Sequence, residues 1–168
     1  MPKKALIIVV IIVVVYILTK LLKVSDVIHK ARQFIAEQES FSSRPYWDFK
    51  QWSWGYGTRV PDSTSSVNVV PAKTISRDEA NTLMVSHISN DYNALKPLVK
   101  KPLSPNQWAA LLSFTYNLGV GTGKTMANRI SNNVSNLEQL WKSYIYAGGQ
   151  VNSGLVSRRN REWNLYNS

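Results

Sequence analysis

The chain opens with a long apolar run. Residues 5–18 contain only alanine, leucine, isoleucine, valine and one tyrosine, and after Thr19 and Lys20 the pair Leu21-Leu22 extends the run to 18 positions in all. An α-helix rises 1.5 Å per residue, so 18 residues span about 27 Å, close to the roughly 30 Å hydrocarbon core of a bilayer. The run therefore predicts a transmembrane helix over residues 5–22. A buried Val/Ile-rich strand is the alternative, which the length of the run disfavours.

Basic residues flank this segment on both sides. Lys3 and Lys4 precede it and favour a cytoplasmic N-terminus with the rest of the chain exported, whereas Lys20 and Lys23 favour the opposite orientation. The residues after the run offer no small-residue cleavage site of the kind a signal peptidase needs. We therefore expect a retained anchor over residues 1–23 and one further domain over residues 24–168.

Helical periodicity follows the anchor. Ser25 or Asp26 is a suitable N-cap for a helix that would end at about Ala36, with apolar residues at helical spacing. Residues 40–72 lack this period and are rich in Trp, Tyr, Ser, Gly and Pro, which favours short strands and turns. We expect a β-rich lobe there.

Four further helices are indicated downstream. Ser76 with Glu79, and Ser104 with Gln107, each form the spacing of a capping box, and Pro105 suits a first helical position. The second of these helices should stop near Gly119. Asn136-x-x-Gln139 predicts a helix that ends before Gly148-Gly149, and a short last helix is expected over about 155–166. The predicted fold class is α+β, with a small β-rich lobe inserted into a mainly helical domain.

Composition narrows the chemistry. The chain has no cysteine, which excludes disulfides, zinc-thiolate sites and thiol nucleophiles, and the distant His29 and His87 do not have the spacing of a metal site. Residues 24–168 keep 16 of the 20 basic side chains against all 10 acidic ones, a net charge of +6 within a total of +10. This charge favours an anionic partner: nucleic acid, acidic phospholipid or cell wall. The sequence contains no run of five or more basic residues, which weakens the case for nucleic acid as the partner.

Two carboxylates stand out among the ten acidic residues. Glu39 follows the first predicted soluble helix, and Asp48 lies nine positions later in the aromatic segment. Hydrolysis of a glycosidic bond needs a protonated carboxyl and an ionised one in different environments, which a helix end and a loop can supply. The spacing alone also fits two surface charges, and Glu37 competes with Glu39 as the acid.

The surrounding motifs resemble the phage-type lysozymes, a family of peptidoglycan hydrolases. The family pattern has Glu before an aromatic or Leu residue, then Tyr-x-Asp, then Thr-Ile-Gly-Tyr-Gly-His. This sequence departs from it at four places: Ser after the acid, Ser for Thr, Trp for Ile, and Thr for His. Three separated segments carry the resemblance in the family's order: 39–58, 103–119 and 154–163.

The resemblance implies a lysozyme-like fold and site residues. Glu39 matches the catalytic acid and Asp48 the catalytic aspartate, while Ser53 stands where a threonine is thought to place the attacking water. It implies an inverting muramidase that hydrolyses the β-1,4 bond between N-acetylmuramic acid and N-acetylglucosamine, without metal or cofactor. The expected substrate-binding residues are Trp54, Tyr56, Tyr116, Asn117 and Arg159, with Arg159 near the acid. Core packing competes with sugar stacking for Trp54, and Glu162 is expected to pair with an arginine of the same helix.

The anchor is similar to that of phage endolysins with an N-terminal signal-anchor. This likeness implies a monomer at the bacterial inner membrane, with a cytoplasmic N-terminus and a periplasmic catalytic domain that binds peptidoglycan strands and no nucleic acid. Because the run is rich in Ile and Val rather than Gly and Ala, both a released and a permanent anchor stay open, as do roles in lysis or in virion entry. A wall-binding module of weak activity and a membrane-tethered nucleic-acid binder are the rival functions.

Overall fold

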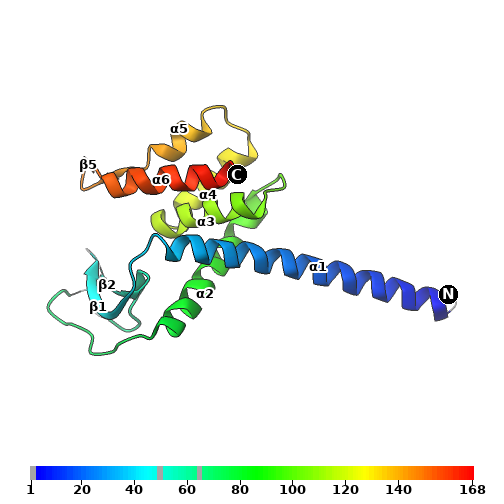
Figure 1. The fold of residues 1–168 in the computed structure, drawn as a ribbon, viewed down its shortest axis with the longest axis horizontal. Coiled ribbons are helices and arrows are strands. Elements are labelled where there is room, and N and C mark those ends of the chain that lie inside the picture. Colours follow the sequence, from blue (N-terminus) through cyan, green and yellow to red (C-terminus); the bar gives the residue numbers. More distant parts are fainter. Residues whose placement is uncertain (1–2, 49–50, 64–65) are drawn as a thin grey trace.

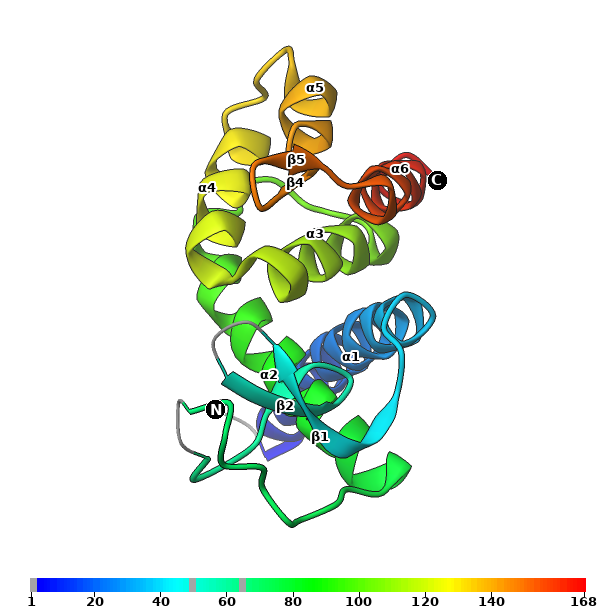
Figure 2. The ribbon, with the colours of Figure 1, turned by 90° about the vertical axis from the view of Figure 1, so that its left-hand side faces the viewer.

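The computed structural model describes residues 3–48, 51–63 and 66–168. Two groups of elements lie on either side of the central helix α3 and the end of α1 (Figures 1 and 2). The elements are, in chain order, α1 (Lys3–Ala36), β1 (Ser42–Asp48), β2 (Gln51–Gly55), β3 (Thr58–Arg59), α2 (Arg77–Leu95), η1 (Lys96–Leu98), α3 (Pro105–Leu118), α4 (Val120–Ser131), α5 (Leu137–Lys142), β4 (Tyr146–Ala147), β5 (Gln150–Val151) and α6 (Ser153–Tyr166).

Helix α1 is one uninterrupted helix that projects from the domain (Figure 1). Its first part is apolar and exposed, and Ala5–Ala36 is long and apolar enough to cross a membrane by length and composition. Its last turns pack in the core through Val27, Ala31 and Ile35. The expected helix start at Ser25 or Asp26 is wrong, because no Gly or Pro breaks the preceding residues and the helix passes through both positions. The predicted end at Ala36 is confirmed.

The β-rich lobe is a three-stranded antiparallel sheet of order β1-β2-β3. Tyr46 pairs with Ser53 and Trp47 with Trp52, and the register shifts between Ser42 and Tyr46. The strands lie between Ser42 and Arg59, and the described residues from there to α2 contain turns and no regular element. The predicted lobe is confirmed, and its regular part is shorter than the predicted 40–72.

Helix α3 is the centre of the helical core. Eight consecutive residues from Trp108 to Thr115 are buried, and α3 packs against α1, α2, α4 and α6. Such a helix, apolar on all sides, requires neighbours on every face. Those neighbours include the end of α1, so the helix that carries the apolar run also closes the core.

Local signals set most helix ends. Both predicted capping boxes are present, and the α3 box has Pro105 at its first turn. Helix α6 begins at Ser153, two residues before the expected start, because the Asn152 side chain accepts a hydrogen bond from the Leu155 amide. Helix α4 and the β4–β5 hairpin were not predicted. Gly119, at φ +84°, makes the sharp turn from α3 into α4.

The close contact between α3 and α4 provides a stability test. A Cβ added at Gly123 would lie 2.4 Å from Thr115 Oγ1, on a fully buried side chain, whereas Gly121 has no atom within 4 Å of such a Cβ. We expect Gly123→Ala to lower the free energy of unfolding by about 1–3 kcal/mol through overpacking. Gly121→Ala is the matched control and should be neutral or slightly stabilising. Thermal unfolding in neutral detergent would measure both, and equal behaviour of the two variants would contradict this packing.

Candidate active site

Glu39 lies just beyond the end of α1. Its amide donates to the Ile35 carbonyl at 3.0 Å, so the last turn of the helix fixes its backbone. Its side chain is 25% exposed, and Oε1 accepts a hydrogen bond from Arg158 Nη1 in an ion pair. Arg158 belongs to α6, on the other side of the fold. The pair therefore joins two segments that are 119 positions apart in the chain.

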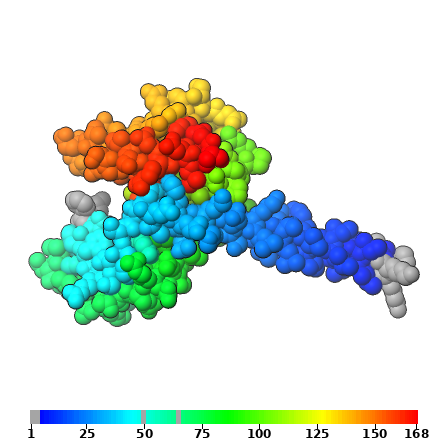
Figure 3. All heavy atoms as spheres, viewed as in Figure 1, coloured from blue at the N-terminus to red at the C-terminus, as the bar shows by residue number. Residues whose placement is uncertain are grey.

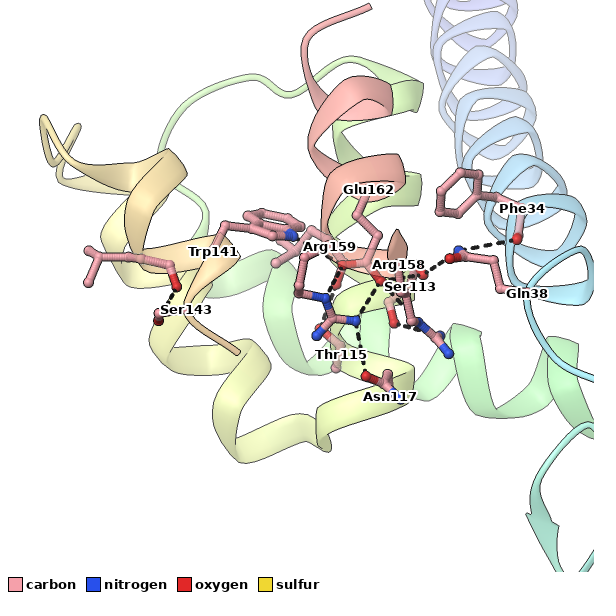
Figure 4. A network of polar contacts seen from close by, with 12 residues as sticks. Phe34, Gln38, Ser113, Thr115, Asn117, Trp141, Ser143, Arg158, Arg159 and Glu162 are labelled. Atoms are coloured by element: carbon pink, nitrogen blue, oxygen red, sulfur yellow. Dashed lines mark hydrogen bonds and ion pairs between the residues drawn. The ribbon is translucent and has the colours of Figure 1, made fainter. Parts of the chain in front are cut away.

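A buried network holds Arg158 in place (Figure 4). Glu162 is fully buried and accepts hydrogen bonds from Arg158 Nε at 3.2 Å, Ser113 Oγ at 2.8 Å and Trp141 Nε1 at 3.0 Å. Arg159 Nη2 donates to the same carboxylate at 2.9 Å. The expectation that Glu162 pairs with an arginine of its own helix is confirmed. A buried carboxylate with four donors is stabilised in its charged form, and it fixes both guanidinium groups.

The turn that follows helix α1 also reaches this network. Gln38 Nε2 donates to Ser113 Oγ at 3.2 Å and lies close to the Phe34 carbonyl, as Figure 4 shows. The residue before Glu39 is thus tied to the same buried serine that binds Glu162. Two contacts, one from Gln38 and one from Arg158, fix the segment that carries Glu39.

Tyr46 links the two candidate carboxylates. Burial raises its pKa above the ordinary value, and the negative charges of Asp48 and Glu39 raise it further. Both carboxylates are therefore near enough to act on one phenol, although they come from different elements. Asp48 is exposed at the end of β1, where water can reach it. The charges of Glu39 and Asp48 thus both act on Tyr46, and their place in one catalytic site stays a prediction.

Tyr116 borders the same site from α3. Its hydroxyl donates to the Tyr56 carbonyl at 2.8 Å. Burial raises its pKa to about 12, and the negative charge of Glu39 adds to this rise. Thr58 stands where the family usually has His, and its buried hydroxyl has no hydrogen-bond partner among the described residues.

Ser53 lies in the middle of β2 and is fully buried. Its hydroxyl accepts a hydrogen bond from Gln51 Nε2 at 3.3 Å, and its strand partner is Tyr46. The hydroxyl is therefore next to the strand that carries Asp48, in an enclosed position. Its expected role in placing water stays a prediction.

Three of the five expected substrate-binding residues are buried, and the other two, Tyr116 and Asn117, are at least partly exposed. Trp54 and Tyr56 are each 7% exposed and belong to the hydrophobic core, so core packing describes them better than sugar stacking. Tyr116 is half-buried at the site and Asn117 is exposed. Arg159 is fully buried, and its Nη2 donates to Asn117 Oδ1 at 3.0 Å. Arg159 can thus orient Asn117 from below.

The ion pair with Glu39 that the structure contains comes from Arg158, which sequence reasoning did not single out. The expectation that Arg159 lies near the acid stays a prediction. The tandem of arginines in the sequence does not tell which one pairs with Glu39. Tyr46, the second residue that sequence reasoning passed over, could have been found from its place two positions before Asp48.

The surface is hollowed where these elements meet. Figure 3 shows a hollow between the orange-red segments, which include α6, and the cyan segments of the sheet. An open pocket of about 370 Å³ is lined by Gln38 and by residues of the β4–β5 hairpin and α6, among them Arg158 and Arg161. Within the described ranges, no group of three or more His, Cys, Asp or Glu side chains could hold a metal ion.

A helical domain with a small sheet lobe, and a carboxylate at the junction between them, defines the lysozyme class. A sequence profile of the Phage lysozyme family matches residues 36–162, from the last residue of α1 to the buried Glu162. The chain belongs to the Phage lysozyme family.

Relatives agree with this assignment. The chain is 29% identical over 120 residues to an endolysin of Bacillus phage B103. The aligned region covers 70% of this chain and 43% of that protein. The chain is 28% identical over 99 residues to a SAR-endolysin of Bacteriophage PS119, covering 56% of this chain and 59% of that protein. The chain thus spans less than half the length of the Bacillus phage relative.

Solved structures share the fold. The muramidase domain of SpmX from Asticaccaulis excentricus has a TM-score of 0.69 at 22% identity and covers 82% of this chain and 95% of that one. An endolysin from Escherichia coli O157:H7 phage FAHEc1 has a TM-score of 0.67 at 23% identity, covering 82% and 90%. These similarities confirm the predicted lysozyme-like α+β fold.

The Glu162 network provides a second stability test. Glu162→Gln removes the negative charge beside two buried guanidinium groups, so we expect the free energy of unfolding to fall by about 3–5 kcal/mol. The matched control is Glu138→Gln, which removes an exposed ion pair with Lys142 and should cost less than about 1 kcal/mol. Chemical unfolding in neutral detergent would measure both losses. Equal losses would show that the network does not support the fold.

Tyr116 predicts a loss of stability at alkaline pH. In the unfolded chain a tyrosine ionises near pH 10, whereas the folded pKa is about 12. The unfolded state loses its proton first, so stability present below pH 10 falls as the pH rises toward 12. Tyr116→Phe should show a shallower fall over this interval, measured as the urea midpoint against pH. Tyr146→Phe, at an exposed position, is the control and should leave the dependence of the urea midpoint on pH unchanged.

Proposed function

We propose that the chain is a muramidase that hydrolyses the β-1,4 bond between N-acetylmuramic acid and N-acetylglucosamine, and that it acts as a phage endolysin in host lysis. The observation that carries this proposal is the family match over residues 36–162. The charges of Glu39 and Asp48, which both raise the pKa of Tyr46, support the proposal that the two carboxylates act together. Peptidoglycan strands are the proposed partner. The net positive charge of residues 24–168 favours binding to an anionic wall.

The proposed reaction is inverting, of the lysozyme type EC 3.2.1.17. Glu39 protonates the leaving oxygen, and Asp48, helped by the Ser53 hydroxyl, directs a water molecule to the opposite face of the sugar. Because Glu39 is paired with Arg158, proton donation requires this ion pair to open when the sugar occupies the site. Asn117 and Tyr116 are the proposed contacts to sugar hydroxyls, and Arg159 acts on substrate through Asn117.

The proposed topology is an anchor over residues 1–23, spanning the bacterial inner membrane through residues 5–22, with a cytoplasmic N-terminus. Residues 24–168 then form a periplasmic catalytic domain that works as a monomer. The exposed apolar face of α1 supports this topology, because thirteen large aliphatic or aromatic side chains between Leu6 and Leu18 contact water unless lipid covers them. A permanent anchor and a released one are both compatible with this arrangement.

The test is wall digestion by variants of the full chain. Glu39→Gln removes the proton donor and should lower the rate at least about 100-fold. Glu37→Gln is the matched control: Glu37 is exposed two positions earlier, and its loss should leave the rate unchanged. Asp48→Asn should abolish most activity, and Ser53→Ala should reduce the rate less.

Mass analysis of the fragments identifies the bond that is cut. Muramidase activity gives shortened glycan strands with intact stem peptides, whereas amide cleavage with intact strands would refute the proposal. The anomeric configuration of freshly formed ends, read by NMR, separates an inverting reaction from a retaining one.

A further inference from the structure

A basic pocket lies on the side of the domain from which α1 projects. The green segment between α2 and α3 faces this side in Figure 1. The pocket has a volume of about 460 Å³, within the range of small-molecule sites. Its lining combines Lys23 of α1 with Lys96 and Lys101 of that segment, and includes no acidic residue.

The three lysines are not neutralised by the protein. Among the residues that the structure describes, none of them forms an ion pair. Lys101 Nζ donates to the neutral Asn133 side chain at 2.8 Å, and Lys96 Nζ lies 5.5 Å from the centre of the Tyr92 ring. Three cations around one hollow repel one another, so an anion placed between them would lower the free energy.

The floor of the pocket is apolar. Tyr92 and Trp108 are each 7% exposed and pack edge to face with ring centres 4.8 Å apart, and Leu103 lines the same hollow. A cationic rim over an apolar floor suits an amphiphile with an anionic head and a hydrocarbon part. Free phosphate would use only the rim.

The position of Lys23 identifies the source of such an amphiphile. Lys23 directly follows Leu22, the last residue of the apolar run. If residues 5–22 fill the hydrocarbon core, Lys23 lies at the level of the lipid headgroups, where basic side chains attract anionic lipids. We propose that the pocket binds the phosphate headgroup of an anionic phospholipid, which would fix the domain against the membrane surface. This inference rests on the proposed membrane topology.

The test measures lipid binding to the full chain in neutral detergent micelles by native mass spectrometry. Dioleoylphosphatidylglycerol should bind on the order of tenfold more tightly than dioleoylphosphatidylcholine, whose choline charge offsets its phosphate. The double variant Lys96→Gln with Lys101→Gln should lose this preference. The control variant, Lys73→Gln with Lys124→Gln, removes the same charge from exposed positions outside the pocket and should keep it.

Further arms separate the alternatives. Equal binding of the two lipids, or equal loss in both double variants, would overturn the proposal. Inorganic phosphate that displaces phosphatidylglycerol at millimolar concentration would assign the site to free phosphate instead. Wall digestion by the Lys96/Lys101 variant should be unchanged. The digestion assay therefore tests the muramidase proposal, and the lipid-binding assay tests the pocket, independently of each other. Alkaline extraction of membranes tests the anchor by itself, because it measures membrane retention of the chain and not its preference between lipids.

Discussion

The buried carboxylate of Glu162 is the interaction on which the arrangement of the site depends. Burial of a charge is costly unless donors surround it, and here α3, α5 and α6 each supply at least one donor. The same carboxylate fixes Arg158, which binds Glu39, and Arg159, which binds Asn117. One buried carboxylate thus fixes the two guanidinium groups that bind the acid and the amide.

The second constraint is the continuity of α1. The helix that carries the apolar run ends at Ala36, three residues before Glu39, and only a short turn separates the helix from Glu39. In the proposed topology the 14 residues that follow Leu22, up to Ala36, rise about 21 Å above the hydrocarbon core. A rigid connection of this length would hold the site at a fixed height, so a tethered enzyme would reach only the glycan strands near that height.

The sequence predicts the fold well where local chemistry decides the structure. The capping residues Ser76 and Ser104 mark two helix starts, and Gly119 marks a helix end. Helix α4 was missed because its sequence, with Gly121 and Gly123, has few helix-forming residues, and its packing on Thr115 is a tertiary effect. Motif order predicts that Glu39 and Asp48 share a site, but the choice of Arg158 over Arg159 depends on the rotation of α6 against α1, which no local pattern encodes.

The burial of Trp54 and Tyr56 changes how sugar recognition is to be understood. Their aromatic faces contribute to the junction between sheet and helices, and the Tyr56 carbonyl accepts from Tyr116. Under the proposed function, the groups left to face a glycan are polar: the Asp48 carboxylate, the Asn117 amide and the Glu39–Arg158 ion pair. Under the proposed mechanism, substrate binding must therefore compete with the Glu39–Arg158 ion pair. A sugar that takes over a hydrogen bond of Arg158 would free Glu39 in the same step, so occupancy of the site and readiness of the acid would be coupled.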